Sequence, residues 1–301
     1  MGLTAKQFTL FPLRWRGIIP REMPVLYIVA TPIGNLEDVT LRALRVLREV
    51  SLIAAEDTRT TRKLLAHHGI HSRLLSYNEH NKAARIPHLL AALRHGDVAL
   101  VSEGGTPAIS DPGLDLVVAA VEAGFTVAPV PGPSAVTAAL AVSGLPARQF
   151  TYLGFLPRRS GERRRLLASL RHHPRTILAF ESPHRLRRSL EDLRTEWGDR
   201  RLAVCRELTK AFEEVFRGRI SEALERFAEP RGEFTLVIEG ATDAPAPPLE
   251  EARRDLLRRK GAGEPAKGAV SEVAKRYGLP RRQVYRMWLE TPPGQPPPPE
   301  Q

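Results

Sequence analysis

The chain has 301 residues, 42% of them hydrophobic and 6% aromatic, which is enough for about two domains with aliphatic cores. No apolar run reaches the roughly 18 residues that a membrane span needs, and Pro12, Arg14 and Arg16 interrupt the N-terminal stretch, which argues against a secretory signal. The formal net charge of +11 suggests a polyanionic partner, although a solvated arginine-rich surface would give the same total.

The single cysteine, Cys205, cannot form a disulfide within the chain, and this fits a reducing cytoplasm. Cys205 lies in an apolar run, so we expect it in the core. None of the nine histidines stands in a zinc-ligand spacing, and we predict no metal site.

The first half of the chain alternates strand-like and helix-like segments. Residues 1–24 are predicted to be an N-terminal extension, and Met23 is an alternative start to Met1. We predict strands at 26–31, 51–57, 73–77, 98–104 and 126–130, and helices at 40–50, 61–68, 113–124 and 134–144. This alternation predicts an α/β domain over 25–145, with a mostly parallel sheet covered by helices on both faces.

A second α/β domain is predicted over 149–240, with a more antiparallel character. Its expected strands are 150–155, 176–182, 201–208, 213–220 and 234–240, and its expected helices are 161–173, 184–198 and 221–229. Residues 241–250, rich in proline and alanine, are predicted to be a linker, and 291–301 a disordered tail. Between them, 251–290 predicts a small helical segment.

Three loops rich in glycine and proline follow predicted strands of the first domain: TPIGN (31–35), SEGGTPAISDPG (102–113) and PGPSA (131–135). Ligands of open α/β sheets bind beyond the carboxyl ends of the strands. Glycine lets the backbone approach a ligand closely, and proline fixes the shape of a loop. Neither the P-loop motif nor the G-x-G-x-x-G dinucleotide motif is present, so the loops predict a ligand held largely by backbone groups.

These loops occur with LIAAEDTRTTRKLL, GFLPR, FESPHRL, RELTKAFEE and GEFTLVIEG, in an order and spacing that resemble the ribosomal RNA small subunit methyltransferase I family. That family belongs to the tetrapyrrole-methylase-like, or class III, methyltransferases. The resemblance spans about residues 25–240 and extends to the helical segment. It implies two α/β domains with S-adenosylmethionine in the cleft between them, a homodimer, and 2′-O-methylation of a decoding-centre cytidine in 16S rRNA of the small ribosomal subunit.

The resemblance also assigns residues to the cofactor. It implies contacts from Pro32, Glu103, Gly104, Gly105, Thr106, Ile109, Ser134 and Ala135 in the first three loops, and from Ser182 and Leu208 in the second domain. Glu103 and Gly104 stand where the family usually has aspartate and alanine. Glu103 keeps the carboxylate but reaches one methylene further, which makes its contact with the cofactor less secure than those of the glycines.

A ribose hydroxyl is a poor acid, so a general base or a positioned water would help the reaction. The acidic candidates are Glu56, Asp57, Asp111, Glu181 and Glu207, and Lys210 could orient the oxygen. Of these we select Asp57, Glu181 and Lys210 as catalytic candidates. Structural alternatives remain open: Asp57 could cap the helix after it, and Glu207 could pair with Arg206 or Lys210.

The positive charge is concentrated in two stretches, as phosphate contacts would require. Residues 158–188 have a net charge of +8, and 251–290 have +6. Residues 270–290 are typical of a helix-turn-helix, with Ala274, Gly278 and Val284 at its crossing, turn and core. The predicted RNA contacts are Arg59, Arg158, Arg159, Arg163, Arg164 and Arg165, followed by Lys275, Arg276, Arg281, Arg282 and Arg286.

Two other functions are compatible with parts of this pattern. A tetrapyrrole methyltransferase would share the cofactor loops but would not need the arginine clusters or the helical segment. A non-enzymatic nucleic-acid-binding protein would use the helix-turn-helix but would not need three cofactor loops. The sequence alone leaves open the catalytic base, the dimer interface, and whether naked rRNA or the assembled 30S subunit is the substrate.

Overall fold

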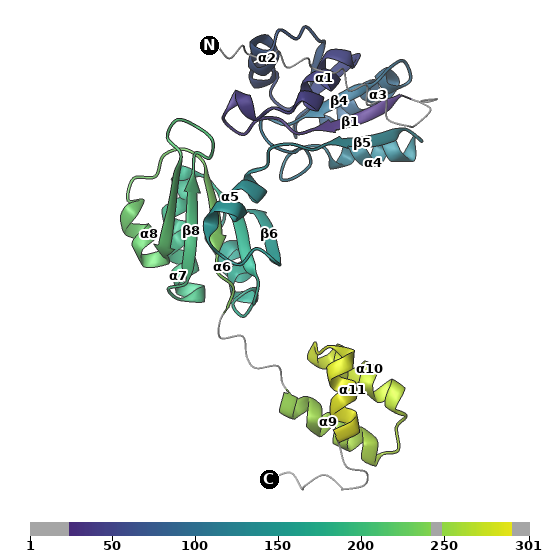
Figure 1. Cartoon of the computed structure of the whole chain (residues 1–301), viewed down its shortest axis with the longest axis vertical. Helices are drawn as coiled ribbons and strands as arrows, with labels where there is room; N and C mark the ends of the chain where they lie inside the picture. Colours follow the sequence, from purple (N-terminus) through teal and green to yellow (C-terminus); the bar gives the residue numbers. More distant parts are fainter. Residues whose placement is uncertain (1–23, 242–248, 291–301) are drawn as a thin grey trace, which may run out of the picture. The chain divides into compact units, whose positions relative to one another are not determined.

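A computed structural model describes residues 24–241 and 249–290 of the chain (Figure 1). The extension predicted before residue 24, most of the predicted linker and the predicted tail over 291–301 lie outside the described residues. The chain divides into two compact units, the first ending at Ser134 and the second beginning at Ala135.

The first unit is built on a five-stranded parallel sheet with the strand order β3-β2-β4-β1-β5. Its strands are β1 (Val25–Val29), β2 (Leu52–Ala55), β3 (Leu74–Ser76), β4 (Val98–Val101) and β5 (Thr126–Val130). The central strand β4 is buried at every position, as expected for a strand covered on both faces. The predicted parallel sheet is confirmed.

Helices cover this sheet on both sides, and separate clusters of buried side chains fill the two faces. They are α1 (Leu41–Glu49), α2 (Thr58–His67), α3 (Lys82–Leu93) and α4 (Leu114–Glu122), with a short 3-10 turn, η1 (Leu36–Asp38). The sequence pattern did not predict α3, because Asn78, Asn81 and Pro87 are typical of loops. Its Leu89 and Leu93 are nevertheless completely buried against the sheet, and this packing outweighs the internal proline.

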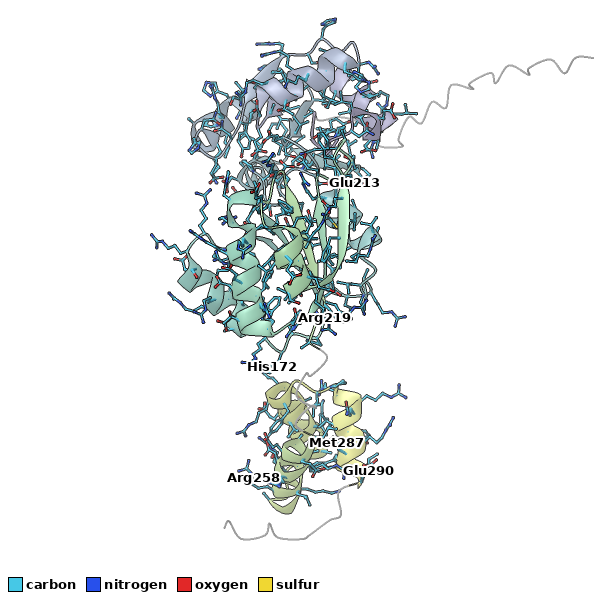
Figure 2. All side chains as sticks on the ribbon, turned by 90° about the vertical axis from the view of Figure 1, so that its left-hand side faces the viewer. His172, Glu213, Arg219, Arg258, Met287 and Glu290 are labelled. Carbon is cyan, nitrogen blue, oxygen red and sulfur yellow. The ribbon has the colours of Figure 1, made fainter. Side chains whose placement is uncertain are left out.

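The second unit contains a mixed five-stranded sheet with the order β6-β7-β10-β8-β9. Its strands are β6 (Phe150–Phe155), β7 (Thr176–Glu181), β8 (Arg201–Arg206), β9 (Glu214–Arg219) and β10 (Phe234–Ile238). Only β6 and β7 pair in parallel, and the other pairs are antiparallel. The predicted antiparallel character is confirmed. Figure 2 labels Glu213, directly before β9, and Arg219, at the end of that strand.

The helices of this sheet are α5 (Ala135–Ser143), α6 (Ser160–Ser169), α7 (Pro183–Trp197) and α8 (Ile220–Arg226). We expected α5 to belong to the first domain, which was predicted to end at residue 145. The structure instead packs α5 against β8, β9 and β10. Its Val136, Ala139 and Leu140 are buried, and Arg217 of β9 donates to the carbonyl oxygen of Val142, which holds the helix on this sheet.

The C-terminal segment forms three helices, α9 (Leu249–Gly261), α10 (Ala266–Tyr277) and α11 (Arg281–Glu290). They enclose a small core of their own, with Met287 turned inward and Arg258 and Glu290 outward (Figure 2). Gly278 ends α10 in the left-handed conformation, at a φ of 64°, which lets the chain turn into α11. The structure thus contains the helical segment that the sequence predicted.

Cys205 lies on β8, an inner strand of the second sheet, and is buried. Burial raises the pKa of its thiol to about 12. In the described ranges, no helix is long and apolar enough to cross a membrane.

Candidate functional site

The three predicted loops of the first unit lie together at one edge of its sheet. Strands β4, β1 and β5 are parallel neighbours, so their carboxyl ends meet at that edge. Thr31 and Gly105 form a bridge between the first and second loops, with both backbone N–H···O distances at 2.9 Å. The hydroxyl of Thr106 donates to the carbonyl oxygen of Pro133 over 3.4 Å and joins the third loop to them.

Close backbone approach defines this loop cluster. A Cβ atom on Gly104 would lie 3.0 Å from the carbonyl oxygen of Pro32, closer than an ordinary van der Waals contact, so the first two loops approach each other closely here. Gly105 has a φ of +87°, which only glycine adopts without strain. The buried hydroxyl of Thr31 has no hydrogen-bond partner among the described residues. A glycine-lined backbone cradle beside an unsatisfied buried hydroxyl fits a polar organic ligand.

The second loop is also strained beyond its glycine. Ala108 and Ser110 have φ values of 66° and 67°, in the left-handed region that non-glycine residues seldom occupy. Such conformations cost about 1–3 kcal/mol each and concentrate at ligand clamps and active sites. The conformation of this loop is therefore held by its surroundings, and its exposed Ile109 lies between the two strained residues.

Carboxylates gather where β2 and β4 end. The backbone N–H of Glu103 donates to Oε2 of Glu56 over 3.1 Å. Burial raises the pKa of Glu56, and the hydrogen bond from the Glu103 backbone opposes this. The charges of Glu103 and Asp57 raise the pKa further. Burial, followed by the charge of Glu56, raises the pKa of Asp111 to about 7. Asp111 was one of five acidic candidates in the sequence, and its environment gives it a pKa suited to proton transfer at neutral pH.

No group of three or more His, Cys, Asp or Glu side chains in the described ranges is arranged to hold a metal ion.

Asp57 occupies the N-cap of α2, as its structural alternative required. Its Oδ1 accepts from the backbone N–H of Arg59 over 2.7 Å, and both carboxylate oxygens accept from the Arg59 guanidinium. These bonds lower the pKa of Asp57 to about 2. A carboxylate so strongly held in the charged form is a weak base, and its observed role is to fix the exposed Arg59 guanidinium.

Glu181, selected as a catalytic candidate, is fully buried at the end of β7. Its Oε1 accepts from the backbone N–H of Ser182 at 2.7 Å and pairs with Arg185 at 2.6 Å, while its Oε2 accepts from the Ser189 hydroxyl. The carboxylate has no exposed surface in the described unit. These contacts favour a supporting role for Glu181 at the turn into α7, whose N-cap is the predicted cofactor residue Ser182.

Lys210 lies in the loop that connects β8 to β9. Its Nζ atom is 3.0 Å from Oε1 of Glu207 and 2.9 Å from Oε2 of Glu233. Burial opposes the charge of Lys210, but the two carboxylates outweigh it and raise the pKa of the lysine. Lys210 is therefore a fixed cation in the described chain, and Glu207 pairs with it as the alternative interpretation required. Leu208, the other predicted cofactor residue of this unit, is buried beside them.

The loop around Lys210 is held in a strained conformation. Glu207 and Thr209 have φ values of 50° and 66°. A Cβ atom on Gly232 would lie 2.6 Å from the side chain of Glu207, so Gly232 leaves the space that Glu207 fills. Such a preorganised loop is consistent with a ligand site.

Comparison with known proteins places the chain in a family. The sequence model of the tetrapyrrole (corrin/porphyrin) methylases matches residues 25–224. Ribosomal RNA small subunit methyltransferase I of Synechocystis sp. is 49% identical over 274 residues, which cover 89% of this chain and 98% of the relative. This chain belongs to the ribosomal RNA small subunit methyltransferase I family of the tetrapyrrole methylases.

Another member of the methyltransferase I family, from Thermotoga maritima, is 52% identical over 221 residues, which cover 72% of this chain and 99% of the relative. More than a quarter of this chain therefore has no counterpart in that relative. The crystal structure of uroporphyrin-III C-methyl transferase from Thermus thermophilus, complexed with S-adenosyl homocysteine, matches with a TM-score of 0.53. It is 21% identical over 72% of this chain and 97% of its own, which shows a shared fold.

In this methyltransferase I chain, the arginines predicted to contact RNA between residues 158 and 165 are less available than the sequence indicated. Arg163 is buried and pairs with Asp192 of α7 at 2.6 Å, so it joins α6 to α7 and is not available to RNA. Arg164 pairs with Glu196, and Arg159 with Glu162. Arg158 and Arg165 are exposed without an ion pair in the described chain. The exposed cations of this stretch are thus fewer than the sequence suggests.

The five basic residues predicted in the helix-turn-helix are all exposed, whereas Ala274 and Val284 are buried as predicted. Arg276 lies 3.5 Å from Asp255 of α9, and the other four have no ion pair within the described ranges. In this family member, the basic surface of the helical segment is less neutralised than that of α6.

Proposed function

We propose that this chain uses S-adenosylmethionine to methylate the ribose 2′-oxygen of a decoding-centre cytidine in 16S rRNA. One observation carries the proposal: three loops form a backbone cradle at the carboxyl edge of the first sheet, in a chain 49% identical to a ribosomal RNA small subunit methyltransferase I. The choice of cytidine and of the 2′-oxygen rests on the sequence resemblance.

The residues proposed to hold the cofactor are those that the resemblance implied: Pro32, Glu103, Gly104, Gly105, Thr106, Ile109, Ser134, Ala135, Ser182 and Leu208. The close approach of Gly104 to Pro32 and the unsatisfied Thr31 hydroxyl support a ligand held by backbone groups. S-adenosylmethionine supplies an activated methyl group on a positively charged sulfur. The protein contributes position, since alignment alone can account for a large part of the rate.

We further propose Asp111 as the group that accepts the ribose proton. The attacking oxygen loses its proton as it gains the methyl group, and a carboxylate oxygen of Asp111 can take it up. With a pKa of about 7, Asp111 is partly ionised at neutral pH, whereas Asp57 is a far weaker base. Glu56 keeps the pKa of Asp111 raised, and Arg59 is proposed to contact the RNA beside this edge.

Labelled S-adenosylmethionine tests the proposed function directly. The protein is incubated with the cofactor and, separately, with 30S subunits that lack the modification, naked 16S rRNA, and a uroporphyrinogen. Label in the RNA on a cytidine 2′-oxygen supports the proposal, and the comparison of subunit with naked rRNA identifies the substrate. Label in the tetrapyrrole alone would contradict it and favour the chemistry named for the Thermus protein.

Removal of residues 245–301 is expected to weaken binding to the 30S subunit by at least about tenfold, because several phosphate contacts are lost. Affinity for S-adenosylmethionine should stay within about twofold, since α9, α10 and α11 have a core of their own. Filter binding and calorimetry measure the two affinities. A parallel loss of both would show that the helical segment is needed for the fold of the rest.

The homodimer that the resemblance implies is also proposed here. Leu114, Val118 and Val121 form an exposed apolar stripe at helical spacing on α4. A Val118→Glu substitution is expected to shift the protein towards the monomer, as measured by light scattering. The matched substitution Glu122→Gln, on the same helix, should leave the mass unchanged.

A further inference from the structure

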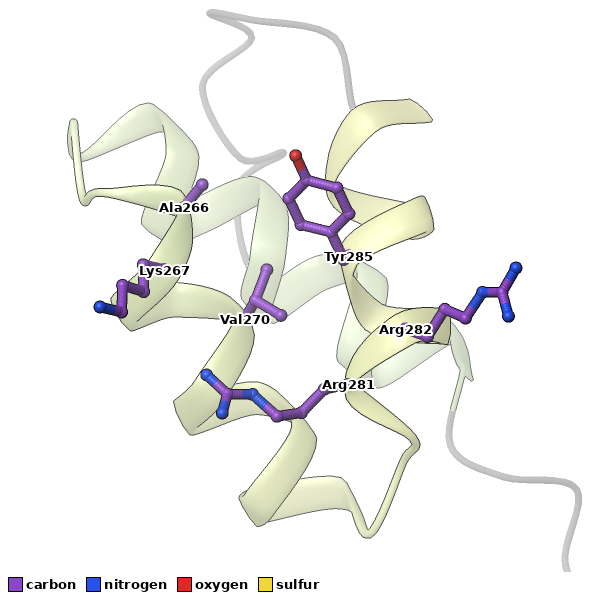
Figure 3. A pocket seen from close by; sticks show the side chains of 6 residues that line it. All are labelled: Ala266, Lys267, Val270, Arg281, Arg282 and Tyr285. Carbon is purple, nitrogen blue, oxygen red and sulfur yellow. The ribbon is translucent and has the colours of Figure 1, made fainter.

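A groove of about 480 Å³ lies between α10 and α11 (Figure 3). Ala266, Lys267 and Val270 line it from α10, and Arg281, Arg282 and Tyr285 from α11. Its size lies in the ~300–1,000 Å³ range of sites for small organic groups. Val270 and the Tyr285 ring form its apolar floor and wall, and Arg281 reaches from α11 towards α10 (Figure 3).

Tyr285 has no evident role in the fold. Half of its surface, 51%, is exposed, while Val284, Met287 and Trp288 supply the buried face of the same helix. A large aromatic ring exposed on a basic helix is unusual for a purely structural residue, because aromatic residues gain most by burial. Sequence analysis missed Tyr285, although its position among Arg281, Arg282 and Arg286 was a signal of nucleic-acid binding.

Charge is distributed unevenly around the helical segment. Asp255 of α9 lies within ion-pair distance of Arg258, Arg259 and Arg276 and neutralises that side. Lys267, Arg281 and Arg282 at the groove have no ion pair within the described residues. The groove is thus positively charged at its rim and apolar inside, and it would complement a group that combines a flat apolar ring with negative charge.

We propose that this groove binds one unpaired nucleotide of RNA, with its base against the Tyr285 ring and its flanking phosphates near Lys267 and Arg281. The inference rests on the proposed function, which makes RNA the macromolecular substrate. Every base has a face that can stack on an aromatic ring, whereas in a duplex that face is covered by its neighbours. The groove is therefore specific for single-stranded segments, unlike a helix-turn-helix that reads the major groove of duplex DNA.

The test compares full-length Tyr285→Leu and Tyr285→Phe with the wild type. The probes are a short labelled single-stranded RNA of decoding-centre sequence and the same RNA annealed to its complement, followed by fluorescence anisotropy. Stacking on an aromatic residue contributes enough that its loss should raise Kd about 5- to 100-fold for the single strand. Tyr285→Phe keeps the ring and should stay within about twofold.

Two further variants separate stacking from charge and from general surface effects. Leu289→Ala, on the same helix and 65% exposed but outside the groove, should bind as the wild type does. Lys267→Ala should weaken binding of the single strand and should reduce the salt dependence of its log K by about 0.7, whereas Tyr285→Leu should leave that salt dependence unchanged.

Equal affinity of Tyr285→Leu and the wild type for the single strand would overturn the inference, as would equal losses for single strand and duplex. A preference of the wild type for duplex DNA over single-stranded RNA would also overturn it. If the wild type methylates 30S subunits while Tyr285→Leu binds RNA normally, the nucleotide site in the groove is refuted and the proposed function stands. If the wild type labels no RNA at all, the proposed function itself has failed.

Discussion

Substitution of Glu181 by glutamine is expected to lower the free energy of unfolding by about 3 kcal/mol, because it leaves the partly buried Arg185 without its counter-charge. The carboxylate also accepts from the Ser182 backbone and the Ser189 hydroxyl, and one oxygen cannot replace both contacts. Denaturant unfolding measures the change. Methyl transfer by the folded fraction should fall by less than about tenfold, since Glu181 positions Ser182 and does not touch the substrate.

Helix α7, which contains Arg185, provides a matched control. Glu191 pairs with Arg187 at the same i,i+4 spacing, but both side chains are about half exposed. Exposed pairs contribute roughly 0–1 kcal/mol, so Glu191→Gln should be close to neutral. A Glu181→Gln protein as stable as the wild type but inactive in methyl transfer would refute the positioning role and return Glu181 to the catalytic candidates.

Asp111→Asn is expected to stabilise the protein at pH 8 while nearly abolishing methyl transfer. The folded-state pKa of Asp111 is about 7, above the ordinary value of 3.8, so the folded protein binds this proton more tightly than the unfolded chain does. The free energy of unfolding consequently falls as pH rises from about 4 to 7, by at most about 4 kcal/mol. Asparagine is uncharged and does not incur this loss.

At pH 5 the stability difference between Asp111→Asn and the wild type should be smaller than at pH 8, because Asp111 is then largely protonated. Urea unfolding at the two pH values measures this, with Glu122→Gln as a control on an exposed carboxylate of α4. The wild-type transfer rate should rise with pH through about 7, and the variant should lose about 100-fold together with that rise. If Asp111→Asn keeps its methyl-transfer activity and gains stability as expected, Asp111 does not accept the ribose proton.

Much of the fold was predictable because local patterns of apolar residues indicate its strands and helices. Apolar runs such as that of β4 and amphipathic helices such as α7 are visible along the chain. The predicted first boundary was late because α5 is nearly apolar all round, and the sequence does not say which sheet it covers. Helix α3 was missed because tertiary packing overrides the local effect of Pro87.

The candidate site was only partly predictable. The three loops could be predicted because close approach of the backbone favours glycine, which is identified directly from the sequence. Ionisation states could not, because burial and partners distant in sequence set them: Asp111 shares its edge with Glu56, and Arg163 meets Asp192 across 29 residues.

Because Cys205 is buried, its rate of chemical modification can measure local unfolding of this chain. Only the thiolate reacts with alkylating reagents, so the Cys205 thiol is protected both by its pKa of about 12 and by its burial on an inner strand of the sheet. Modification requires β8 to separate from β9 and β10, so its rate reports the opening of the second sheet and ignores unfolding of the helices after it. Reagents that label this thiol can therefore follow one part of the molecule without any engineered cysteine.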